Sequence, residues 1–268
     1  MSERTLYLRA DVVFRHTERV MGTVVSFEVR PRRVRPEQAW KAIREACRVL
    51  HRADDVFSLY RHDTPLSRLR RGELTLEDCP SEVATVLALC EQAHEQSGGW
   101  FDPWALPGAV DPTGLVKGWA AREAARVLQD AGIAAAMVNA AGDIVTFGHP
   151  TRHRAWRVGV RSPQGPDRLL CVVDAPGAIA TSGSYERGEH VLDPYTGKPT
   201  AAAISATVCG PDLALADAFA TGLLAGGEAA FGAVTNAGYH ALILTPDGGV
   251  THTDAFPFAR DREPAAAA

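Results

Sequence analysis

Two hard oxygen donors, Asp217 and Thr221, stand one helical turn apart in the apolar stretch ADAFAT. On a helix, residues i and i+4 project from the same face, so the two side chains can share one ligand. Magnesium prefers such donors and usually keeps waters or phosphate oxygens in its other positions. A structural alternative is a first-turn aspartate followed by a threonine that bonds back to a helical carbonyl. Taken alone, the spacing favours this alternative.

A glycine-rich loop places further charged groups just before a predicted helix. The segment GGWFDP…DPTGLVKG carries Asp102, Asp111 and Lys117. Backbone N–H groups at a helix N-terminus attract phosphates and a lysine adds a full charge, so a diphosphate suits this place. The segment is not a Walker motif, because no Ser or Thr follows the lysine. A helix start with a solvated lysine explains the same residues equally well.

The segment TSGSYERG offers hydroxyl and backbone groups in a predicted turn. Thr181, Ser182, Gly183 and Ser184 can form a backbone nest there. His190 follows closely and can take a proton from a hydroxyl nucleophile near neutral pH. A serine with His190 also suggests a serine hydrolase, but the G-x-S-x-G elbow of that class is missing. The remaining histidines lack the sequence spacing of metal ligands.

The hydrophobic pattern predicts the elements that position these residues. Apolar stripes and breakers indicate helices over residues 36–57, 80–98, 117–131, from 211 onward, and 228–235. A strand with a bulge at Gly22 is predicted over 20–29, followed later by the short runs AMVN, DIVTFG, WRVGVR, LLCVVD, AIAT and ISATVC and a closing hairpin, YHALILTPDGGVTHT. Successive strands with helices elsewhere predict an α+β fold with a mixed, largely antiparallel sheet and flanking helices.

Composition and charge narrow the class of protein. The 268 residues are 46% hydrophobic and 22% charged, as in an ordinary globular protein. The net charge of −4 argues against nucleic-acid binding, which needs a basic face. The charged N-terminal stretch leaves no apolar region for a signal peptide, and no uninterrupted apolar run reaches the roughly 18 residues of a membrane span. We therefore expect a cytoplasmic protein without a membrane anchor, whose five cysteines are reduced and mostly buried.

Taken together, the motifs resemble the ApbE family of flavin transferases, which split FAD and attach its FMN half to a threonine or serine of an acceptor protein. The resemblance runs in order through MGT at 21–23, SLYRHDTPLSRL, GGWFDP, DPTGLVKGWA, VNAAGDI, WRVGVRSP, ATSGSYERG, HVLDPYTGKP and ADAFAT. It implies a compact, two-lobed fold around a flavin cleft. We expect this domain to span residues 16–258, between an N-terminal segment (1–15) and a disordered tail (259–268).

The resemblance also implies roles for single residues. Asp217 and Thr221 match magnesium ligands, with the main-chain oxygen of Gly114 as a third, and manganese offers similar oxygen chemistry. His190 matches the histidine that activates the incoming hydroxyl, and Lys117 is expected to screen charge. The implied FAD contacts are Met21, Tyr60, Trp100, Phe101, Asp102, Asp111, Lys117 and Leu192, to which we add Ser182 and Gly183 of the predicted nest.

The expected activity is therefore magnesium-dependent transfer of FMN to a Ser or Thr of a cytoplasmic acceptor protein, with release of AMP, by a monomer or homodimer. Two alternatives share the cleft: an FAD pyrophosphatase that gives FMN and AMP, and a non-catalytic FAD-binding protein. Three positions depart from the family pattern. Arg70 replaces a frequent Asn, Ala141 replaces the first of two glycines, and Arg122 lies where an aspartate is usual.

Overall fold

The computed structural model describes residues 12–105, 110–151, 154–163, 165, 168–175, 177–183, 192–200 and 202–259. The strands in these ranges are β1 (Phe14–Val20), β2 (Thr23–Arg30), β3 (Ala135–Ala140), β4 (Asp143–Phe147), β5 (Arg157–Arg161), β6 (Leu169–Asp174), β7 (Ala178–Gly183), β8 (Ser205–Gly210), β9 (His240–Leu244) and β10 (Val250–His252). The helices are α1 (Pro36–Phe57), α2 (Pro65–Arg70), α3 (Ser81–Gln96), α4 (Thr113–Asp130), α6 (Leu213–Gly226) and α7 (Phe231–Asn236), with a 3-10 turn η2 (Gly227–Ala230). Apart from Ala259, the predicted tail lies outside the described residues.

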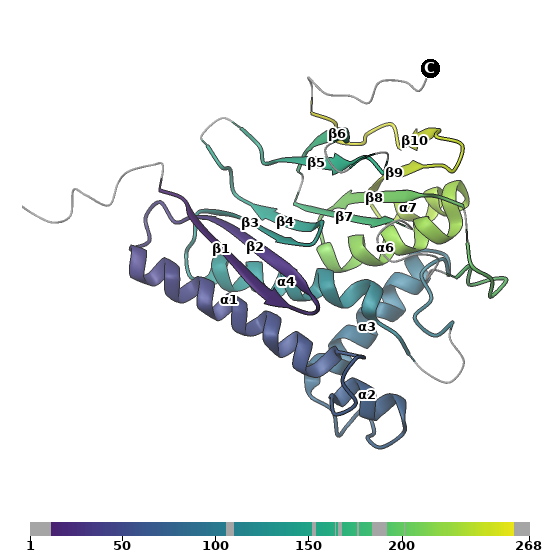
Figure 1. Cartoon of the computed structure of the whole chain (residues 1–268), viewed down its shortest axis with the longest axis horizontal. Helices are drawn as coiled ribbons and strands as arrows, with labels where there is room; N and C mark the ends of the chain where they lie inside the picture. The colour runs from purple at the N-terminus through teal and green to yellow at the C-terminus, as the bar shows by residue number, and fades with distance from the viewer. Residues whose placement is uncertain are drawn as a thin grey trace, which may run out of the picture.

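Eight strands form one sheet in the order β1-β2-β3-β4-β7-β8-β9-β10, and each neighbouring pair is antiparallel. β5 and β6 form a separate two-stranded ribbon. The long helices gather on one face of the sheet, and the ribbon lies over the other face (Figure 1). This arrangement confirms the predicted α+β class, with an antiparallel sheet and flanking helices.

Alternate residues of the central strands face two separate cores, because successive side chains of a strand point to opposite faces. In β8, Val208 packs into the large core under the helices, whereas Cys209 packs into the smaller core under the ribbon. Ala241 and Leu242 of β9 divide in the same way. All residues of β8 are therefore buried, and the sheet is held rigidly between two layers.

The strand predicted over residues 20–29 is confirmed from Thr23 onward as β2, but its start and its bulge are wrong, because the chain turns before Thr23. Met21 and Gly22 form the two-residue turn of the β1–β2 hairpin, with φ angles of 53° and 68°. Positive φ at both central residues is the type I′ geometry that suits the twist of a hairpin, so Gly22 supports a turn and no bulge. Ala141 and Gly142 repeat this pattern between β3 and β4, with φ angles of 52° and 100°. The pairing of β2 with β3, and of β4 with β7, brings both turns to the sheet end where β7 finishes.

Two helices differ from the sequence-based expectation. α2 lies between the first two predicted helices, where no helix was predicted. It begins at Pro65 after a Thr64 side chain that accepts the Ser67 amide at 3.2 Å. α4 begins at Thr113, earlier than predicted, because the Asp111 carboxylate accepts the Thr113 amide at 3.0 Å. Lys117 therefore lies inside a helix and does not precede one.

α6 is almost entirely buried, with twelve of its fourteen residues shielded from solvent. Its N-cap Asp212 accepts the amides of Ala214 and Leu215, at 2.9 and 3.3 Å. Together with η2 and α7, it forms the segment Leu213–Asn236, which alone among the described residues is long and apolar enough to cross a membrane. Its most apolar window is 78% buried inside the protein, as expected of a core helix.

Candidate functional site

The carboxylate of Asp217 is buried in the middle of α6. Only 4% of the residue is exposed, and its neighbours along the helix are apolar. Burying a carboxylate is costly unless hydrogen bonds or a cation compensate for the lost water. The Gly118 amide of α4 donates to Asp217 Oδ2 at 2.9 Å. A regular helix would direct this N–H at the Gly114 carbonyl, so Asp217 interacts with the same turn of α4 that holds Gly114.

Close packing of α4 against α6 depends on Gly118. A Cβ at this position would lie 2.5 Å from the Leu213 carbonyl oxygen and 2.9 Å from Asp217 Cβ. Both separations are far below a normal contact, so only glycine lets the two helix backbones approach this closely. Because the helices pack this closely, the Gly118 amide of α4 reaches the Asp217 carboxylate.

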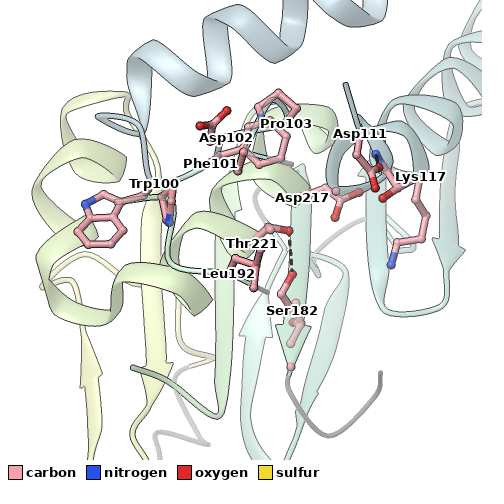
Figure 2. Close-up of a pocket in the computed structure, with 16 residues that line it drawn as sticks. Trp100, Phe101, Asp102, Pro103, Asp111, Lys117, Ser182, Leu192, Asp217 and Thr221 are labelled. Carbon is pink, nitrogen blue, oxygen red and sulfur yellow. Dashed lines mark hydrogen bonds between the residues drawn. The ribbon is translucent and has the colours of Figure 1, made fainter. Parts of the chain in front are cut away.

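Gly114, one turn before Gly118 in α4, lies directly against Thr221, one turn after Asp217 in α6. A Cβ on Gly114 would lie 3.1 Å from Thr221 Oγ1 and 3.2 Å from the Phe101 ring. Thr221 Oγ1 also lies 3.4 Å from Ser182 Oγ, which reaches it from the end of β7 (Figure 2). The structure therefore brings together Asp217, Thr221 and Gly114, the three residues that the resemblance implies as magnesium ligands.

These groups line a cavity of about 300 Å³ between α4, α6, the end of β7 and the loop after α3. Figure 2 shows the Asp217, Thr221 and Ser182 side chains grouped in it, with Trp100 on one side and Lys117 on the other. Its walls combine aromatic, carboxylate, hydroxyl and backbone groups. The lining residues are Trp100, Phe101, Asp102, Pro103, Ala105, Asp111, Thr113, Gly114, Lys117, Thr181, Ser182, Gly183, Leu192, Pro194, Asp217 and Thr221.

The aromatic side of the cavity is built by the loop after α3. Gly98 and Gly99 both adopt positive φ angles, 65° and 87°, which turn the chain sharply toward α6. Trp100 then packs over Gly226, where a Cβ would lie 2.5 Å from its ring. Tyr195 contacts the other side of Trp100 edge-on, with ring centroids 4.7 Å apart, and its hydroxyl donates to the Gly98 carbonyl. Tyr195 was not predicted as a site residue, because this contact joins segments that are far apart in the sequence.

The two loop aspartates hold local backbone structure as well as lining the cavity. Asp102 Oδ1 accepts the Trp104 amide at 2.8 Å, and Asp111 Oδ1 accepts the Thr113 amide at 3.0 Å. These are the hydrogen bonds by which aspartates shape turns and helix starts. Among the described residues, no hydrogen bond is recorded to the second oxygen of either carboxylate.

The Lys117 ammonium forms a buried ion pair that the sequence did not predict. Its Nζ lies 2.7 Å from Oδ2 of Asp143, whose side chain is 1% exposed. The other Asp143 oxygen accepts the Thr181 amide at 3.2 Å, which fixes the carboxylate to β7. Asp143 lies in the VNAAGDI motif, but nothing in the sequence indicated its partner. Lys117 still lines the cavity, with 21% of its side chain exposed.

The predicted turn at Thr181–Gly183 is wrong, because these residues belong to a strand. Thr181, Ser182 and Gly183 are the last residues of β7, and they pair with β8 in register. Their backbone groups therefore serve the sheet. The Ser182 side chain reaches Thr221 in the cavity, whereas Thr181 Oγ1 lies 3.0 Å from Thr207 Oγ1 of β8. Ser184 and the predicted base His190 lie outside the described residues.

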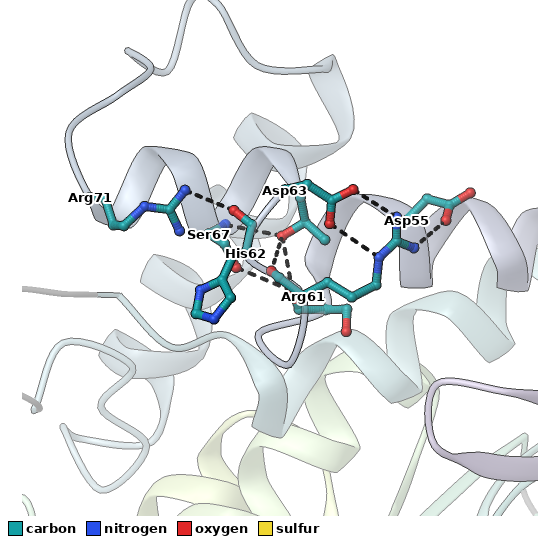
Figure 3. A network of polar contacts seen from close by, with 8 residues as sticks. Asp55, Arg61, His62, Asp63, Ser67 and Arg71 are labelled. Atoms are coloured by element: carbon teal, nitrogen blue, oxygen red, sulfur yellow. Dashed lines mark hydrogen bonds and ion pairs between the residues drawn. The ribbon is translucent and has the colours of Figure 1, made fainter.

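Met21 and Tyr60, two expected FAD contacts, are not among the described residues that line the cavity. Tyr60 is 97% exposed, at the end of α1. The residues after Tyr60, together with Asp55 of α1, form the polar network of Figure 3. In it, Arg61 binds Asp55 at 2.6 Å and Asp63 at 3.2 Å. This network fixes the loop that presents Tyr60 to solvent.

The positions that depart from the family pattern have different surroundings. Arg122 Nη1 binds the Asp212 carboxylate at 2.6 Å, so it ties α4 to the N-cap of α6. Ala141 adopts the positive φ that glycine tolerates more easily. Arg70 ends α2, and nothing in the structure explains its presence there.

All five cysteines are free, and all but Cys79 are buried, as predicted.

Comparison with known proteins gives a family and a fold. A sequence model of the ApbE family matches residues 21–108 and 105–243. The chain is 33% identical over 170 residues to the FAD:protein FMN transferase of Klebsiella pneumoniae (strain 342), covering 59% of this chain and 49% of that protein. It thus spans about half the length of the curated relatives that it matches.

Two solved structures share the fold. The apo form of the Pseudomonas stutzeri flavinyl transferase ApbE superposes with a TM-score of 0.78 at 21% identity, over 91% of this chain and 96% of that one. The flavin transferase ApbE from Vibrio cholerae gives 0.75 at 23% identity, over 90% and 96%. At these identities the superpositions establish the architecture alone.

Proposed function

The chain belongs to the ApbE family, and we propose that it is a magnesium-dependent transferase that moves FMN from FAD onto a Ser or Thr of an acceptor protein. The observation that carries this proposal is the buried Asp217 carboxylate at the wall of the cavity, one turn from Thr221, whose hydroxyl lies against Gly114. Such an assembly has the composition of a divalent-cation site beside a substrate pocket.

The donor set fits magnesium. Asp217 and Thr221 supply hard oxygens, and the Gly114 carbonyl adds a third. A Cβ on Gly114 would crowd Thr221, so glycine at this position lets the first turn of α4 lie close to the other two ligands. When bound there, the ion would neutralise charge on the diphosphate of FAD and on the AMP leaving group. The Gly118 hydrogen bond orients the carboxylate for this role.

The remaining residues position FAD and handle the proton. The acceptor hydroxyl oxygen forms a new bond to the phosphorus of the FMN half, and the bond from that phosphorus to the AMP oxygen breaks. His190 accepts the hydroxyl proton in this proposal, because a histidine titrates near neutral pH. Lys117, oriented by Asp143, donates hydrogen bonds to phosphate oxygens.

The size of the cavity indicates how much of the FAD molecule can lie inside it and how much must lie on the protein surface. About 300 Å³ is at the lower end of the range for ligand pockets, roughly 300–1,000 Å³, so the cavity holds only part of FAD. We place the diphosphate and the group next to it here, against Trp100 and Leu192. In this arrangement the exposed Tyr60 and the Met21 turn contact the remaining part of FAD.

The decisive experiment mixes the purified chain with FAD, magnesium and a candidate acceptor domain, then measures flavin fluorescence that stays on the denatured acceptor. We expect Thr221→Ala to lower the transfer rate at least about 100-fold, the scale of losing a transition-state charge contact. Thr235→Ala is the matched control, because this exposed helical threonine bonds only to carbonyls of α7 in the described contacts. Transfer that survives chelation of magnesium, or that Thr221→Ala leaves unchanged, contradicts the proposal.

The same mixture separates the alternatives. A pyrophosphatase converts FAD to FMN and AMP while every acceptor stays unlabelled, because water replaces the hydroxyl. A flavin-binding protein retains FAD without converting it, and substitution of Asp217 changes no rate. The cytoplasmic location and the choice between monomer and homodimer stay predictions.

A further inference from the structure

Four potential ligand side chains meet between β1 and α1, on the far side of the sheet from the β5–β6 ribbon. His16 and Glu18 alternate with exposed residues of β1, so both side chains turn toward the helix. Cys47 and His51 lie one turn apart on α1 and face the strand. None of these residues lines the cavity described above, as far as its described walls extend.

The contacts inside this cluster are short. His16 Nε2 lies 3.1 Å from Glu18 Oε2, and His51 Nε2 lies 3.0 Å from Glu18 Oε1. One ligand atom each from His16, Glu18 and Cys47 fall within 4.8 Å of one another. Ligand atoms around a tetrahedral zinc ion, with bonds of roughly 2.0–2.3 Å, stand about 3.3–3.8 Å apart. The three atoms therefore need only small side-chain rotations to surround an ion.

From this geometry we propose that His16, Glu18 and Cys47 bind a zinc ion that joins the β1–β2 hairpin to α1. The ligand types favour zinc, because one imidazole, one carboxylate and one thiolate form a mixed N, O, S set. Magnesium, which prefers oxygen ligands alone, suits this set poorly.

His51 has the role of a positioning residue in this site. It hydrogen-bonds the Glu18 oxygen opposite the one near His16, so it can hold the carboxylate after that carboxylate has bound zinc. The fourth zinc position then faces solvent, since the side chains of His16 and His51 are 33% and 50% exposed. Cys47 closes the inner side, with 7% of the residue exposed.

In the metal-free protein the thiol is protonated. Burial, followed by the charge of Glu18, raises the pKa of Cys47 to about 12. Hydrogen bonds from His16 and then His51 lower the pKa of Glu18, so its carboxylate is ionised. Zinc binding breaks the S–H bond of Cys47 and releases that proton to solvent as the S–Zn bond forms.

The sequence alone does not reveal this site. His16 and Glu18 are separated by one residue on a strand, whereas Cys47 and His51 lie about thirty residues later in the sequence, on a helix. The pairing of β1 with β2 and the packing of Phe14 against Trp40, with ring centroids 5.2 Å apart, bring the strand onto α1. The pattern therefore matches no zinc motif with ligands close in sequence.

Titration with cobalt(II) and with zinc, each alone, tests the proposal on the purified full chain after chelator treatment. We expect cobalt to give the near-ultraviolet band of a thiolate–cobalt bond, and Cys47→Ser to abolish it. The oxygen site at Asp217 contains no sulfur and cannot produce this band. His16→Ala removes a proposed ligand and should weaken zinc binding at least about tenfold, the smallest loss typical of removing even an outer-shell partner.

Matched controls are Cys79→Ser, a partly buried thiol outside the cluster, and His252→Ala, an exposed histidine of β10. Both should keep the cobalt band and the zinc affinity. If Cys47→Ser fails to fold, His16→Ala still tests the site, because His16 is only partly buried. Absence of the thiolate band in the folded parent protein, or equal zinc affinity for the parent and His16→Ala, overturns the proposal.

Discussion

Replacing Gly118 by alanine should separate the α4 and α6 backbones and disturb the Asp217 carboxylate. The new Cβ would begin 2.5 Å from the Leu213 carbonyl oxygen, and no rotation can relieve a contact between a Cβ and the backbone. Restoring a normal separation of about 3.5 Å needs a displacement of about 1 Å. The 2.9 Å hydrogen bond from the Gly118 amide to Asp217 then breaks.

Two opposing terms set the effect on stability. Overpacking a core contact costs about 1–3 kcal/mol, whereas alanine is better than glycine inside a helix by about 1 kcal/mol. The net loss of unfolding free energy is therefore about 0–2 kcal/mol. The transfer rate should fall much more, about 100-fold, because a displacement of about 1 Å at a catalytic site has an effect of that size.

Thermal melting and the acceptor-labelling rate, measured on the same preparations, test this difference. Gly232→Ala is the control, because it adds a Cβ to helix α7 where nothing lies within 4 Å. We expect the control to melt at or slightly above the parent temperature and to keep its rate. A Gly118→Ala protein that transfers FMN within about threefold of the parent rate would refute the argument from helix contact.

Three further predictions concern a base, a turn and an ion pair. His190→Ala should keep the parent affinity for FAD, measured by fluorescence titration, while transfer falls about 10²–10⁴-fold. Ala141→Gly should raise the free energy of unfolding by up to about 1 kcal/mol in urea denaturation, because it removes a side chain held at a φ of 52°. Glu82→Gln should cost less than about 1 kcal/mol above pH 4.5, since the Arg52 hydrogen bond lowers the pKa of Glu82 in the folded state. That difference should vanish as the pH falls through the lowered pKa, which denaturation curves at neutral and acidic pH can follow.

Local patterns were sufficient to predict α1 and α6, although they placed the start of α4 four residues too late. Pro36 begins α1 as expected, and the Asp217–Thr221 spacing does place both side chains on one face of a helix. These features depend on neighbours within a few residues, which periodicity and capping chemistry describe well.

Contacts between distant segments could not be predicted in the same way. The Lys117–Asp143 ion pair exists because α4 packs across the start of β4, and no residue near either partner indicates that packing. The Met21 turn was missed because its flanking residues are β-branched on both sides, so a hairpin resembles one strand unless a turn is recognised at Met21–Gly22. Asp143 was missed as a site residue for the same reason as its partner.

If the chain has the proposed function, the placement of the site on the fold predicts that the metal-dependent step and flavin binding can be altered separately. Asp217, Thr221 and Gly114 lie on two helices packed in the central core, where backbone contacts fix their positions. Trp100 and Tyr60 lie on loops, which tolerate change more readily than core helices do. Substitutions on the helices should therefore stop the phosphoryl step in protein that still binds FAD, whereas substitutions in the loops should weaken FAD binding first.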